Sequence, residues 1–467
     1  MRMEDTICAL STAAGMGAIA MIRVSGPETY TVLNKIYKPF SAQHKLENNE
    51  GYKMVFGSLM DGEQLIDEVM LGLFKGPKSY TGEDVIEISC HGSTYIQERI
   101  LGLLMRQGIR MADPGEYTLR AFINGKMDLS QAEAIADLIA SENKASHQIA
   151  LQHMRGGISD EIRALRSELI DFVSLIELEL DFAEEDVEFA DRSKFQELLN
   201  RIEQVLSSLI SSYDTGNAIK NGVPVAIVGA PNAGKSTLLN ALLKEEKAIV
   251  TEIAGTTRDA IEDEIHIDGI SYRFIDTAGI RETTDMVESI GIKRTYEKVE
   301  QSDLVLYLFA ADRLQSPEGW QELESEYQDI QIRAGERNFL FILNKAELVP
   351  ELSSEQEQKL KDLKALHLSA KDKKGLEELH AQISAFYQWG DLAAQQSIVT
   401  NVRHLDALQK SLIQIEKVRE GLDFGISGDL LSIDIRAALS ELGSIIGEVD
   451  VDKDILGNIF GKFCIGK

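Results

Sequence analysis

One segment of eight residues, Gly229-Ala-Pro-Asn-Ala-Gly234-Lys235-Ser236, matches the G-x-x-x-x-G-K-[ST] pattern of a phosphate-binding loop. Glycines in such a loop let backbone amides approach phosphate oxygens, and the N-terminus of the following helix favours an anion. The Lys235 ammonium is expected to reach the β- and γ-phosphates, and the Ser236 hydroxyl to ligate Mg²⁺. The predicted phosphate-binding residues are Asn232, Ala233, Gly234, Lys235, Ser236 and Thr237.

Further motifs follow in the order expected of a guanine-nucleotide site. Residues 255–259, Gly-Thr-Thr-Arg-Asp, suit a switch segment whose threonine completes the Mg²⁺ shell. The segment Asp276-Thr277-Ala278-Gly279 can contact a metal-bound water and the γ-phosphate. Asn344-Lys345-Ala346-Glu347 is interpreted as the guanine reader, because its carboxylate can accept from guanine N1 and the exocyclic amine. Ser369-Ala370-Lys371 suits the last loop around the base, and the five motifs together favour a GTPase over an unrelated α/β domain.

Two positions depart from the usual GTPase pattern. Glu347 stands where the guanine reader usually ends in Asp. The extra methylene keeps the chemistry but moves the carboxylate, so weaker nucleotide binding or guanine selectivity is expected. Ile280 stands where Ras-like proteins carry the glutamine that orients the attacking water. Since isoleucine cannot hydrogen-bond water, hydrolysis must recruit another polar group, another cation, or both.

The elements that position these motifs can be read from the apolar pattern. Short apolar runs at 225–228, 274–275, 304–309 and 339–343 alternate with helical stretches, which predicts a parallel sheet with crossover helices. Proline-free stretches with three- and four-residue apolar spacing predict helices over about 128–215 and 398–460. The α/β domain is therefore inserted into a helical domain.

The first part of the chain has a mixed pattern. Strands are expected at 18–24, 52–59, 68–74 and 85–89, and helices at 30–37 and 96–107. This pattern predicts an α+β domain. The expected organisation is an N-terminal domain at 1–122, a first helical segment at 123–221, a GTPase domain at 222–388 and a second helical segment at 389–467.

The composition indicates the cellular compartment and the kind of partner that are expected. The net charge of −28 argues against a large basic surface that binds nucleic acid. If the protein acts on RNA, a partner is therefore expected to make much of the RNA contact. Three cysteines, Cys8, Cys90 and Cys464, cannot build a disulfide framework, which favours a reducing cytosol. Cys8 and Cys90 are interpreted as buried, small apolar residues. No secretory signal pattern and no long uninterrupted apolar run occur, so a cytoplasmic protein that does not cross a membrane is expected.

The sequence resembles the MnmE (TrmE) family of tRNA modification GTPases over essentially its whole length. The ending Phe463-Cys-Ile-Gly-Lys467 carries this resemblance most specifically. Residues 251–259 and 122–133 also match the family. The resemblance implies a multidomain α/β and α+β protein: an N-terminal α+β domain for folate binding and dimerisation, a discontinuous helical domain, and an inserted Ras-like P-loop GTPase domain.

The resemblance also implies an activity and partners. Family members are homodimers that act with MnmG, an FAD-dependent protein that uses NADH, in a heterotetramer or larger complex. Together they add an aminomethyl or carboxymethylaminomethyl group to C5 of the wobble uridine of certain tRNAs, with a one-carbon unit from methylene-tetrahydrofolate. The implied cofactors are GTP, Mg²⁺, K⁺ and a tetrahydrofolate derivative. Two other functional hypotheses remain open. The protein could be a ribosome-assembly GTPase switch, or a one-carbon-transfer enzyme with an accessory GTPase.

Residue roles follow by motif match to the family. Glu288 would orient the attacking water, although alone it could be a solvated surface carboxylate. Thr257 would join Ser236 on Mg²⁺, and K⁺ would be held by Asn232, Thr251, Ile253 and Thr256. Asn232 could instead cap its turn. Folate would contact Arg23, Glu87, Lys126 and Lys467, and Cys464, near Lys462 and Lys467, is a candidate functional thiol.

Overall fold

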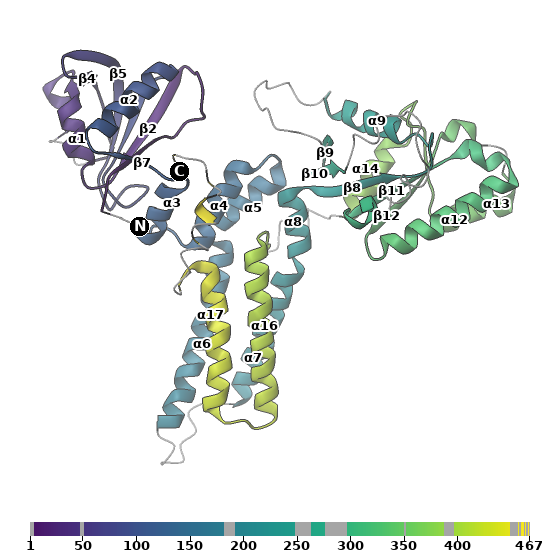
Figure 1. The fold of residues 1–467 in the computed structure, drawn as a ribbon. Coiled ribbons are helices and arrows are strands. Elements are labelled where there is room, and N and C mark those ends of the chain that lie inside the picture. Colours follow the sequence, from purple (N-terminus) through teal and green to yellow (C-terminus); the bar gives the residue numbers. More distant parts are fainter. Residues whose placement is uncertain are drawn as a thin grey trace. The chain divides into compact units, whose positions relative to one another are not determined.

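The computed structural model divides the chain into two compact units. It describes residues 4–46, 51–181, 192–247, 263–275, 297–349, 352–386 and 397–448, and then 456, 459–461, 463 and 466. The first unit comprises Met1–Ile139, Leu151–Gln204 and Asp406–Lys467, and the second comprises Ala140–Ala150 and Val205–Leu405 (Figure 1). Within the described part of the chain, no helix is both long and apolar enough to span a membrane.

The first unit begins with a seven-stranded sheet in the order β3-β4-β5-β6-β2-β1-β7. The strands are β1 (Ile7–Leu10), β2 (Ile19–Ser25), β3 (Tyr37–Pro39), β4 (Lys53–Asp61), β5 (Gln64–Phe74), β6 (Val85–His91) and β7 (Arg110–Met111). The helices are α1 (Thr29–Ile36), α2 (Thr94–Arg106) and α3 (Glu116–Ile123), with a 3-10 turn at Ala42–His44. All predicted strands and helices of this domain are confirmed, but β1, β3, β7 and α3 were not predicted.

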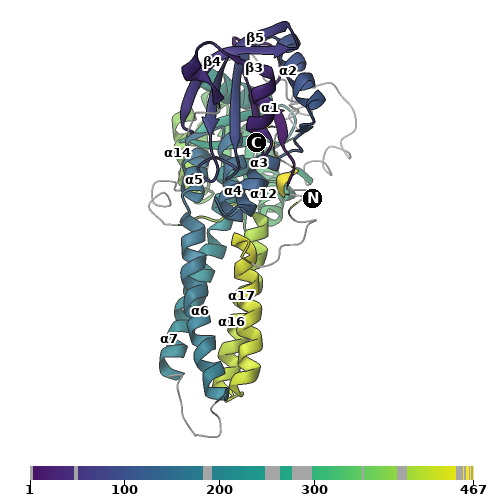
Figure 2. The same cartoon turned by 90° about the vertical axis from the view of Figure 1, so that its left-hand side faces the viewer.

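One face of this sheet is covered by α1 and α2, and Figure 2 shows both helices beside the strands. In β6, Ile86, Ile88 and Cys90 are buried, whereas the alternate residues Glu87, Ser89 and His91 are more exposed. Side chains of a strand alternate between faces, so Glu87, Ser89 and His91 share the sheet face opposite the helices. The interpretation of Cys8 and Cys90 as buried is confirmed, and burial raises the pKa of the Cys8 thiol to about 12 and that of Cys90 to about 11.

The rest of the first unit is helical. It contains α4 (Leu129–Ala140), α6 (Gly157–Asp181), most of α7 (Arg192–Ser211), most of α16 (Val402–Asp423) and α17 (Gly428–Ile446). The long helices lie side by side in both views (Figures 1 and 2). The rings of Phe172 and Phe195 stack with centroids 3.6 Å apart and join α6 to α7. Helices are confirmed in both predicted stretches as far as Ile446, whereas residues 182–191 of the first stretch and 449–455 and 457–458 of the second lie outside the described residues.

The second unit is built on a six-stranded sheet in the order β13-β12-β11-β8-β10-β9. Its strands are β8 (Val223–Val228), β9 (Asp263–Ile267), β10 (Ile270–Phe274), β11 (Leu304–Ala310), β12 (Asn338–Asn344) and β13 (Leu366–Leu368). Its helices include α5 (Lys144–Met154) up to Ala150, α8 (Tyr213–Asn221), α9 (Lys235–Lys247), α12 (Pro317–Ala334), α13 (Ser354–Asp362) and α14 (Leu376–Phe386).

The predicted strands of this sheet pair parallel, and one edge adds an antiparallel strand that was not predicted. β9 pairs antiparallel with β10, while the other pairs in this sheet are parallel. Only Asp268 and Gly269 connect β9 to β10, and so short a connection can form only a hairpin. Both residues have positive φ, 49° and 84°, as the tight turn of a hairpin requires. The central strand β11 is buried at every position, as expected for a parallel strand covered on both faces.

Candidate functional site

The phosphate-binding motif forms the loop between β8 and α9. Its two outer glycines, Gly229 and Gly234, have φ of 148° and 98°. A Cβ on Gly229 would lie 2.2 Å from the carbonyl oxygen of Leu308, and one on Gly234 would lie 2.1 Å from Nδ2 of Asn344. Neither position can carry a side chain, so the motif's glycines let the loop backbone lie directly against the neighbouring strands.

Lys235 begins α9, and its ammonium is turned into this loop. Its Nζ donates to the carbonyl oxygens of Gly229 and Ala230 at 2.8 and 2.9 Å. Burial, and then the nearby Lys298, lower the pKa of the Lys235 ammonium. The side chain is therefore already placed over the loop that its motif assigns to phosphate.

The other predicted phosphate-loop residues surround Lys235. Ser236 is half-buried and Thr237 is exposed in the first turn of α9. Asn232 lies at the exposed tip of the loop with φ of 64°. Its side chain makes no hydrogen bond to any residue that the structure describes, so the alternative in which Asn232 caps its own turn has no support there.

Asn344, at the end of β12, connects the phosphate loop to the last base loop. The residue is 2% exposed. Its Nδ2 donates to the carbonyl oxygen of Ala233 at 2.8 Å, and its Oδ1 accepts from the backbone N–H of Ala370 at 3.1 Å. One carboxamide thus fixes the spacing between segment 229–236 and segment 369–371, which the sequence had assigned to the same nucleotide.

The remaining base-reading residues gather beside Asn344. Lys345 has φ of 60°, and its Nζ lies 2.9 Å from a carboxylate oxygen of Asp312. The Glu347 carboxylate is exposed, so a base can reach it. A hydrogen bond from Ser369, then its own backbone amide and the charges of Lys371 and Lys345, hold the pKa of Glu347 below its usual value. The segment 344–347, predicted to read guanine, and the segment 369–371 therefore form one cluster.

Several predicted site residues lie outside the described residues. They are Thr251, Ile253, Thr256, Thr257, Asp276, Thr277, Ala278, Gly279, Ile280, Glu288, Lys462, Cys464 and Lys467. Their predicted roles toward Mg²⁺, K⁺, water and folate stay predictions.

In the N-terminal domain, the structure brings two predicted folate residues together. Arg23 on β2 and Glu87 on β6 are register partners, and Arg23 donates from Nε and Nη2 to Oε1 of Glu87 at 3.0 and 2.8 Å. The rings of Tyr80 and Tyr117 lie 5.2 and 5.5 Å from the Arg23 guanidinium carbon. The sequence pattern did not predict these tyrosines, because they come from a loop and a helix far away in the chain.

Of the other ligand candidates, the structure describes Lys126, and it also describes Gly466, the neighbour of Lys467. The Nζ of Lys126 donates to the carbonyl oxygen of Pro77 at 2.9 Å. Near the C-terminus, the Ser11 hydroxyl donates to the carbonyl oxygen of Gly466 at 3.1 Å. A Cβ on Gly466 would lie 2.1 Å from the carbonyl oxygen of Leu10. Gly466 is therefore packed against the end of β1, two strands away from β6 in the sheet.

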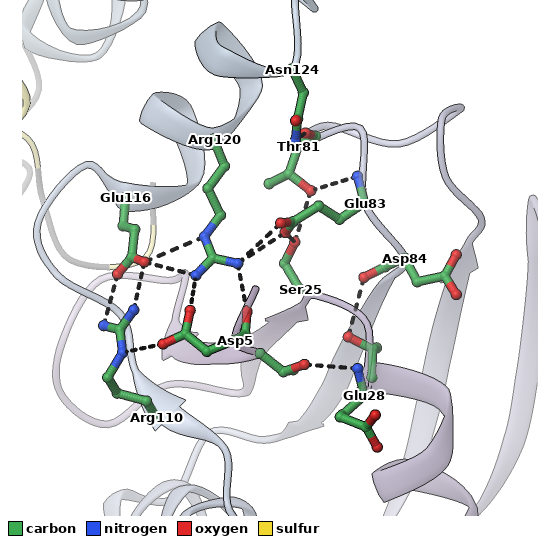
Figure 3. Close-up of polar contacts among 12 residues, drawn as sticks. Asp5, Ser25, Glu28, Thr81, Glu83, Asp84, Arg110, Glu116, Arg120 and Asn124 are labelled. Carbon is green, nitrogen blue, oxygen red and sulfur yellow. Dashed lines mark hydrogen bonds and ion pairs between the residues drawn. The ribbon is translucent and has the colours of Figure 1, made fainter. Parts of the chain in front are cut away.

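A buried ionic network supports this region, and sequence reasoning missed it. Figure 3 shows the guanidinium of Arg120, which is 1% exposed, between the carboxylates of Asp5, Glu83 and Glu116. The corresponding N–O distances are 2.7, 3.1 and 2.9 Å. Arg110 forms a second bridge between Asp5 and Glu116, at 2.8 and 2.7 Å. Burial alone would lower the pKa of Arg120, but the bonds and charges of Glu116 and Glu83 raise it overall.

The network fixes the loop that precedes β6. Glu83 also accepts from the Ser25 hydroxyl at 2.6 Å, and Ser25 contacts Thr81 at 2.7 Å (Figure 3). At the end of α3, Nδ2 of Asn124 donates to the Thr81 carbonyl oxygen at 2.7 Å. Since Tyr80 lies in this loop, the network positions one wall of the Arg23 site.

Comparison with known proteins gives the family. A model described as "MnmE helical domain" matches residues 129–464, and one described as "GTP-binding protein TrmE N-terminus" matches residues 6–126. The tRNA modification GTPase MnmE of Flavobacterium johnsoniae is 56% identical, with 99% of each chain covered. This chain belongs to the MnmE family of tRNA modification GTPases.

Other MnmE relatives agree over the whole length. The protein from Christiangramia forsetii is 54% identical, and 100% of each chain is covered. The protein from Bacteroides thetaiotaomicron is 51% identical, with 99% of this chain and 100% of its own chain covered. The FeoB G-domain of Methanococcus jannaschii is 28% identical over 36% of this chain and 98% of its own, at a TM-score of 0.24. The MnmE resemblance and the predicted fold class are confirmed, whereas the domain boundaries stay predictions.

The Asn344 contacts predict a defined nucleotide-binding defect. In Asn344→Asp, the carboxylate can still accept from Ala370 but faces the Ala233 carbonyl without a proton to donate. An unsatisfied buried acceptor costs about 1–3 kcal/mol, and 1.4 kcal/mol is tenfold in affinity, so the GTP dissociation constant should rise roughly 5- to 100-fold. Titration with a fluorescent GTP analogue measures it. Asn221→Asp, an exposed change in the same unit, is the control, and wild-type affinity in Asn344→Asp would refute the bridging role.

The buried Arg120 predicts a large local loss of stability. Arg120→Met leaves three carboxylates without their shared cation and should cost about 3–5 kcal/mol, as for other broken buried ion pairs. Arg99→Met is a matched control, because the Arg99–Asp61 pair is partly exposed and should contribute less than about 1 kcal/mol. Hydrogen exchange of the β1 and α3 amides in the full chain measures the loss of stability in both variants. Equal exchange in the two variants would show that the network is dispensable.

The same network sets an acid limit. A hydrogen bond from Arg110 lowers the pKa of Asp5, and bonds from Arg110 and Arg120 outweigh burial to lower that of Glu116. A carboxylate whose pKa is lower in the folded protein than in the unfolded chain stabilises the fold fully above its unfolded pKa, which is near 4. This stabilisation is lost as the pH falls through the folded pKa. Exchange protection of β1 and α3 should therefore fall below about pH 4 in the wild type. In Glu116→Gln this loss of protection at low pH should be smaller. The same pH dependence in Glu116→Gln and the wild type would contradict a role for Glu116 in the acid sensitivity.

Proposed function

We propose that this chain is the GTP-hydrolysing component of a complex that adds an aminomethyl or carboxymethylaminomethyl group to C5 of the wobble uridine of tRNA. The group's one-carbon unit comes from a tetrahydrofolate derivative. The observation that carries the proposal is that, in one chain of the MnmE family, Asn344 joins the predicted phosphate loop to the predicted base loop, while Arg23 and Glu87 pair in the N-terminal domain.

The nucleotide site fits GTP. Gly229 and Gly234 bring backbone amides to the surface without side chains, and Lys235 supplies the positive charge for the phosphates. The exposed Glu347 carboxylate, beside Ser369, can accept from the two guanine donors that adenine lacks. Ser236 and Thr257 would hold Mg²⁺, which neutralises charge on the β- and γ-phosphates.

K⁺ activation follows from two residues. Ile280 cannot orient the attacking water, so the developing charge needs another stabiliser. Asn232 presents its side chain at the loop tip, where Thr251, Ile253 and Thr256 would complete a shell of oxygen ligands. A fixed monovalent cation there supplies the charge that an arginine finger supplies elsewhere. Glu288 would then orient the water.

The N-terminal site fits a folate. Both Arg23 bonds fall on Oε1 of Glu87, so Oε2 can face the amino and ring N–H groups of a pterin. The rings of Tyr80 and Tyr117 offer flat apolar surfaces next to it. Lys126 and Lys467 are basic groups suited to a glutamate tail, and Cys464 stays a candidate functional thiol.

The partners follow from the family and from charge. A homodimer joined through the N-terminal domains would act with MnmG, which brings FAD, in a heterotetramer or larger complex. With a net charge of −28, this chain would depend on its partner for much of the tRNA contact. The reaction would take place in the cytoplasm.

Mass spectrometry of tRNA nucleosides tests the proposal. Cells that lack this protein should lose the C5 substituent of their wobble uridines, and the wild-type gene should restore it. Lys235→Ala, which removes the phosphate-binding ammonium, should not restore it. Unchanged nucleosides together with a defect in ribosomal subunits would favour the ribosome-assembly GTPase instead.

The cation hypothesis predicts a salt-specific rate. GTP turnover in K⁺ should exceed turnover in Na⁺ at equal ionic strength by at least about tenfold, because the fixed cation stabilises transition-state charge. Asn232→Ala should remove the difference, and Asn221→Ala, a change outside the loop, should keep it. A steady-state phosphate-release assay measures both, and equal wild-type rates in the two salts would exclude K⁺ activation.

The base-reading hypothesis predicts a change of nucleotide. Xanthine has a carbonyl where guanine has an amine, so Glu347→Asn should favour xanthosine triphosphate by donating to that carbonyl. Charge-assisted hydrogen bonds contribute roughly 1.5–3 kcal/mol, so GTP affinity should fall by more than tenfold. Glu347→Asp, the control, should keep GTP as the preferred nucleotide. Paired titrations decide the matter, since undiminished GTP binding by Glu347→Asn would mean that another residue reads the base.

A further inference from the structure

A histidine–aspartate pair lies at the end of β6, outside the residues assigned above. Nδ1 of His91 is 2.8 Å from Oδ1 of Asp67, which lies on β5. The backbone N–H of His91 donates to Oδ2 of Asp67 at 2.8 Å, and that of Glu68 donates to Oδ1 at 2.9 Å. The Asp67 side chain is 8% exposed, whereas the His91 side chain is 71% exposed.

These contacts fix which imidazole nitrogen can exchange protons with a ligand. An ionised carboxylate only accepts hydrogen bonds, so Nδ1 carries the hydrogen that lies between His91 and Asp67. The other nitrogen, Nε2, is therefore the one left for a ligand, on a side chain that is 71% exposed. A buried carboxylate that orients an imidazole in this way is typical of acid–base residues.

The alternation of β6 places His91 on the same sheet face as the proposed folate site, while Asp67 alternates with the buried Val69 and Leu71 of β5. His91 and Glu87 are four residues apart on β6 and point to the face opposite α1 and α2. Four strand residues span about 13 Å, which is comparable with the length of a pterin and the first part of its arm. A folate whose pterin edge contacts Glu87 could therefore extend along β6 toward His91.

Few other charged residues lie on the segments next to His91. β5 contributes Asp67 and Glu68, and β2 places the uncharged Ile19 opposite His91. Residues 11–18, Ser-Thr-Ala-Ala-Gly-Met-Gly-Ala, carry no charge, and they meet this corner through a bond from Gly17 N–H to the Gly92 carbonyl oxygen at 3.0 Å. A Cβ on Gly92 would lie 2.3 Å from the Gly17 carbonyl oxygen, so the strand end and this segment are in direct contact.

We propose that His91, oriented by Asp67, is the residue that protonates the folate during one-carbon transfer. This inference rests on the proposed function. Nε2 of protonated His91 gives its proton to N10 of methylene-tetrahydrofolate as the bond between N10 and the one-carbon unit breaks. The electron pair of that bond stays on N10, and the lone pair of N5 forms a second bond to the carbon. The positive charge moves from the imidazolium to the folate, and no oxidant or reductant is consumed.

A purely structural role for the pair makes a different prediction. If His91 served only to satisfy the buried Asp67 carboxylate, any donor at the Nδ1 position would suffice. Asparagine places an amide nitrogen near that position and can donate to Asp67, but it cannot transfer a proton. His91→Asn therefore separates proton transfer from support of Asp67, and His91→Gln, whose amide reaches nearer to Nε2, is its companion.

The experiment reconstitutes uridine modification with the full-length protein, its FAD-dependent partner, tRNA, GTP and methylene-tetrahydrofolate. His91→Asn and His91→Gln should lower the maximal modification rate by about 10²–10³-fold, the effect typical of a lost general acid. Asp67→Asn should lower it by a smaller factor. The dissociation constant for tetrahydrofolate, the GTP hydrolysis rate and the melting temperature of His91→Asn should stay at wild-type values.

A second readout does not depend on turnover. In the wild-type protein labelled with ¹⁵N-histidine, tetrahydrofolate should shift the Nε2 resonance of His91 and leave its Nδ1 resonance in the protonated range. A wild-type modification rate in His91→Asn, or no change at Nε2 on addition of tetrahydrofolate that binds, would overturn the role of His91 alone. Failure of the wild-type protein to bind tetrahydrofolate would overturn the proposed function as well.

Discussion

The proposed nucleotide site depends on one buried carboxamide. Asn344 has both a donor and an acceptor in a place that water does not reach, and a buried polar group without a partner is costly. The Ala233 carbonyl and the Ala370 amide satisfy the two atoms, so the phosphate loop and the last base loop must keep a single spacing. The lack of room for a Cβ at Gly234 follows from the same contact. The phosphate and base sites are therefore positioned together.

The N-terminal domain uses charge for the same purpose. Arg120 is buried among carboxylates from three separate segments, and Arg110 links two of them again. Removing one member would leave uncompensated charge in the interior, so the network specifies one arrangement of α3 and the loop before β6. Arg23 and Glu87 then lie at a fixed place on the sheet, and His91 lies on the same face farther along β6. Each binding region thus has a rigid support of its own.

Local sequence predicted the parts of the site that are contiguous. The phosphate loop and the base reader each follow an apolar strand, so their placement at strand ends needed no long-range information. The bridge from Asn344 to Ala233, the rings around Arg23 and the pair of Asp67 with His91 join residues that are distant in the sequence, and no spacing predicts them. Short strands such as β1 and β7 were missed because two to four residues carry too little periodicity. The antiparallel β9 was missed because its hairpin turn, Asp268-Gly269, was not recognised as one.

Hydrogen exchange at the Ala370 amide tests most directly whether Asn344 assembles the nucleotide site. In the full-length protein without added nucleotide, this amide should be protected, because it donates to a buried side chain. In Asn344→Ala the protection should disappear, while the amides of the central strand β11 should exchange as slowly as in the wild type. Equal protection of Ala370 in both proteins, or protection in the wild type only after GTP is added, would contradict a site that the carboxamide assembles in advance.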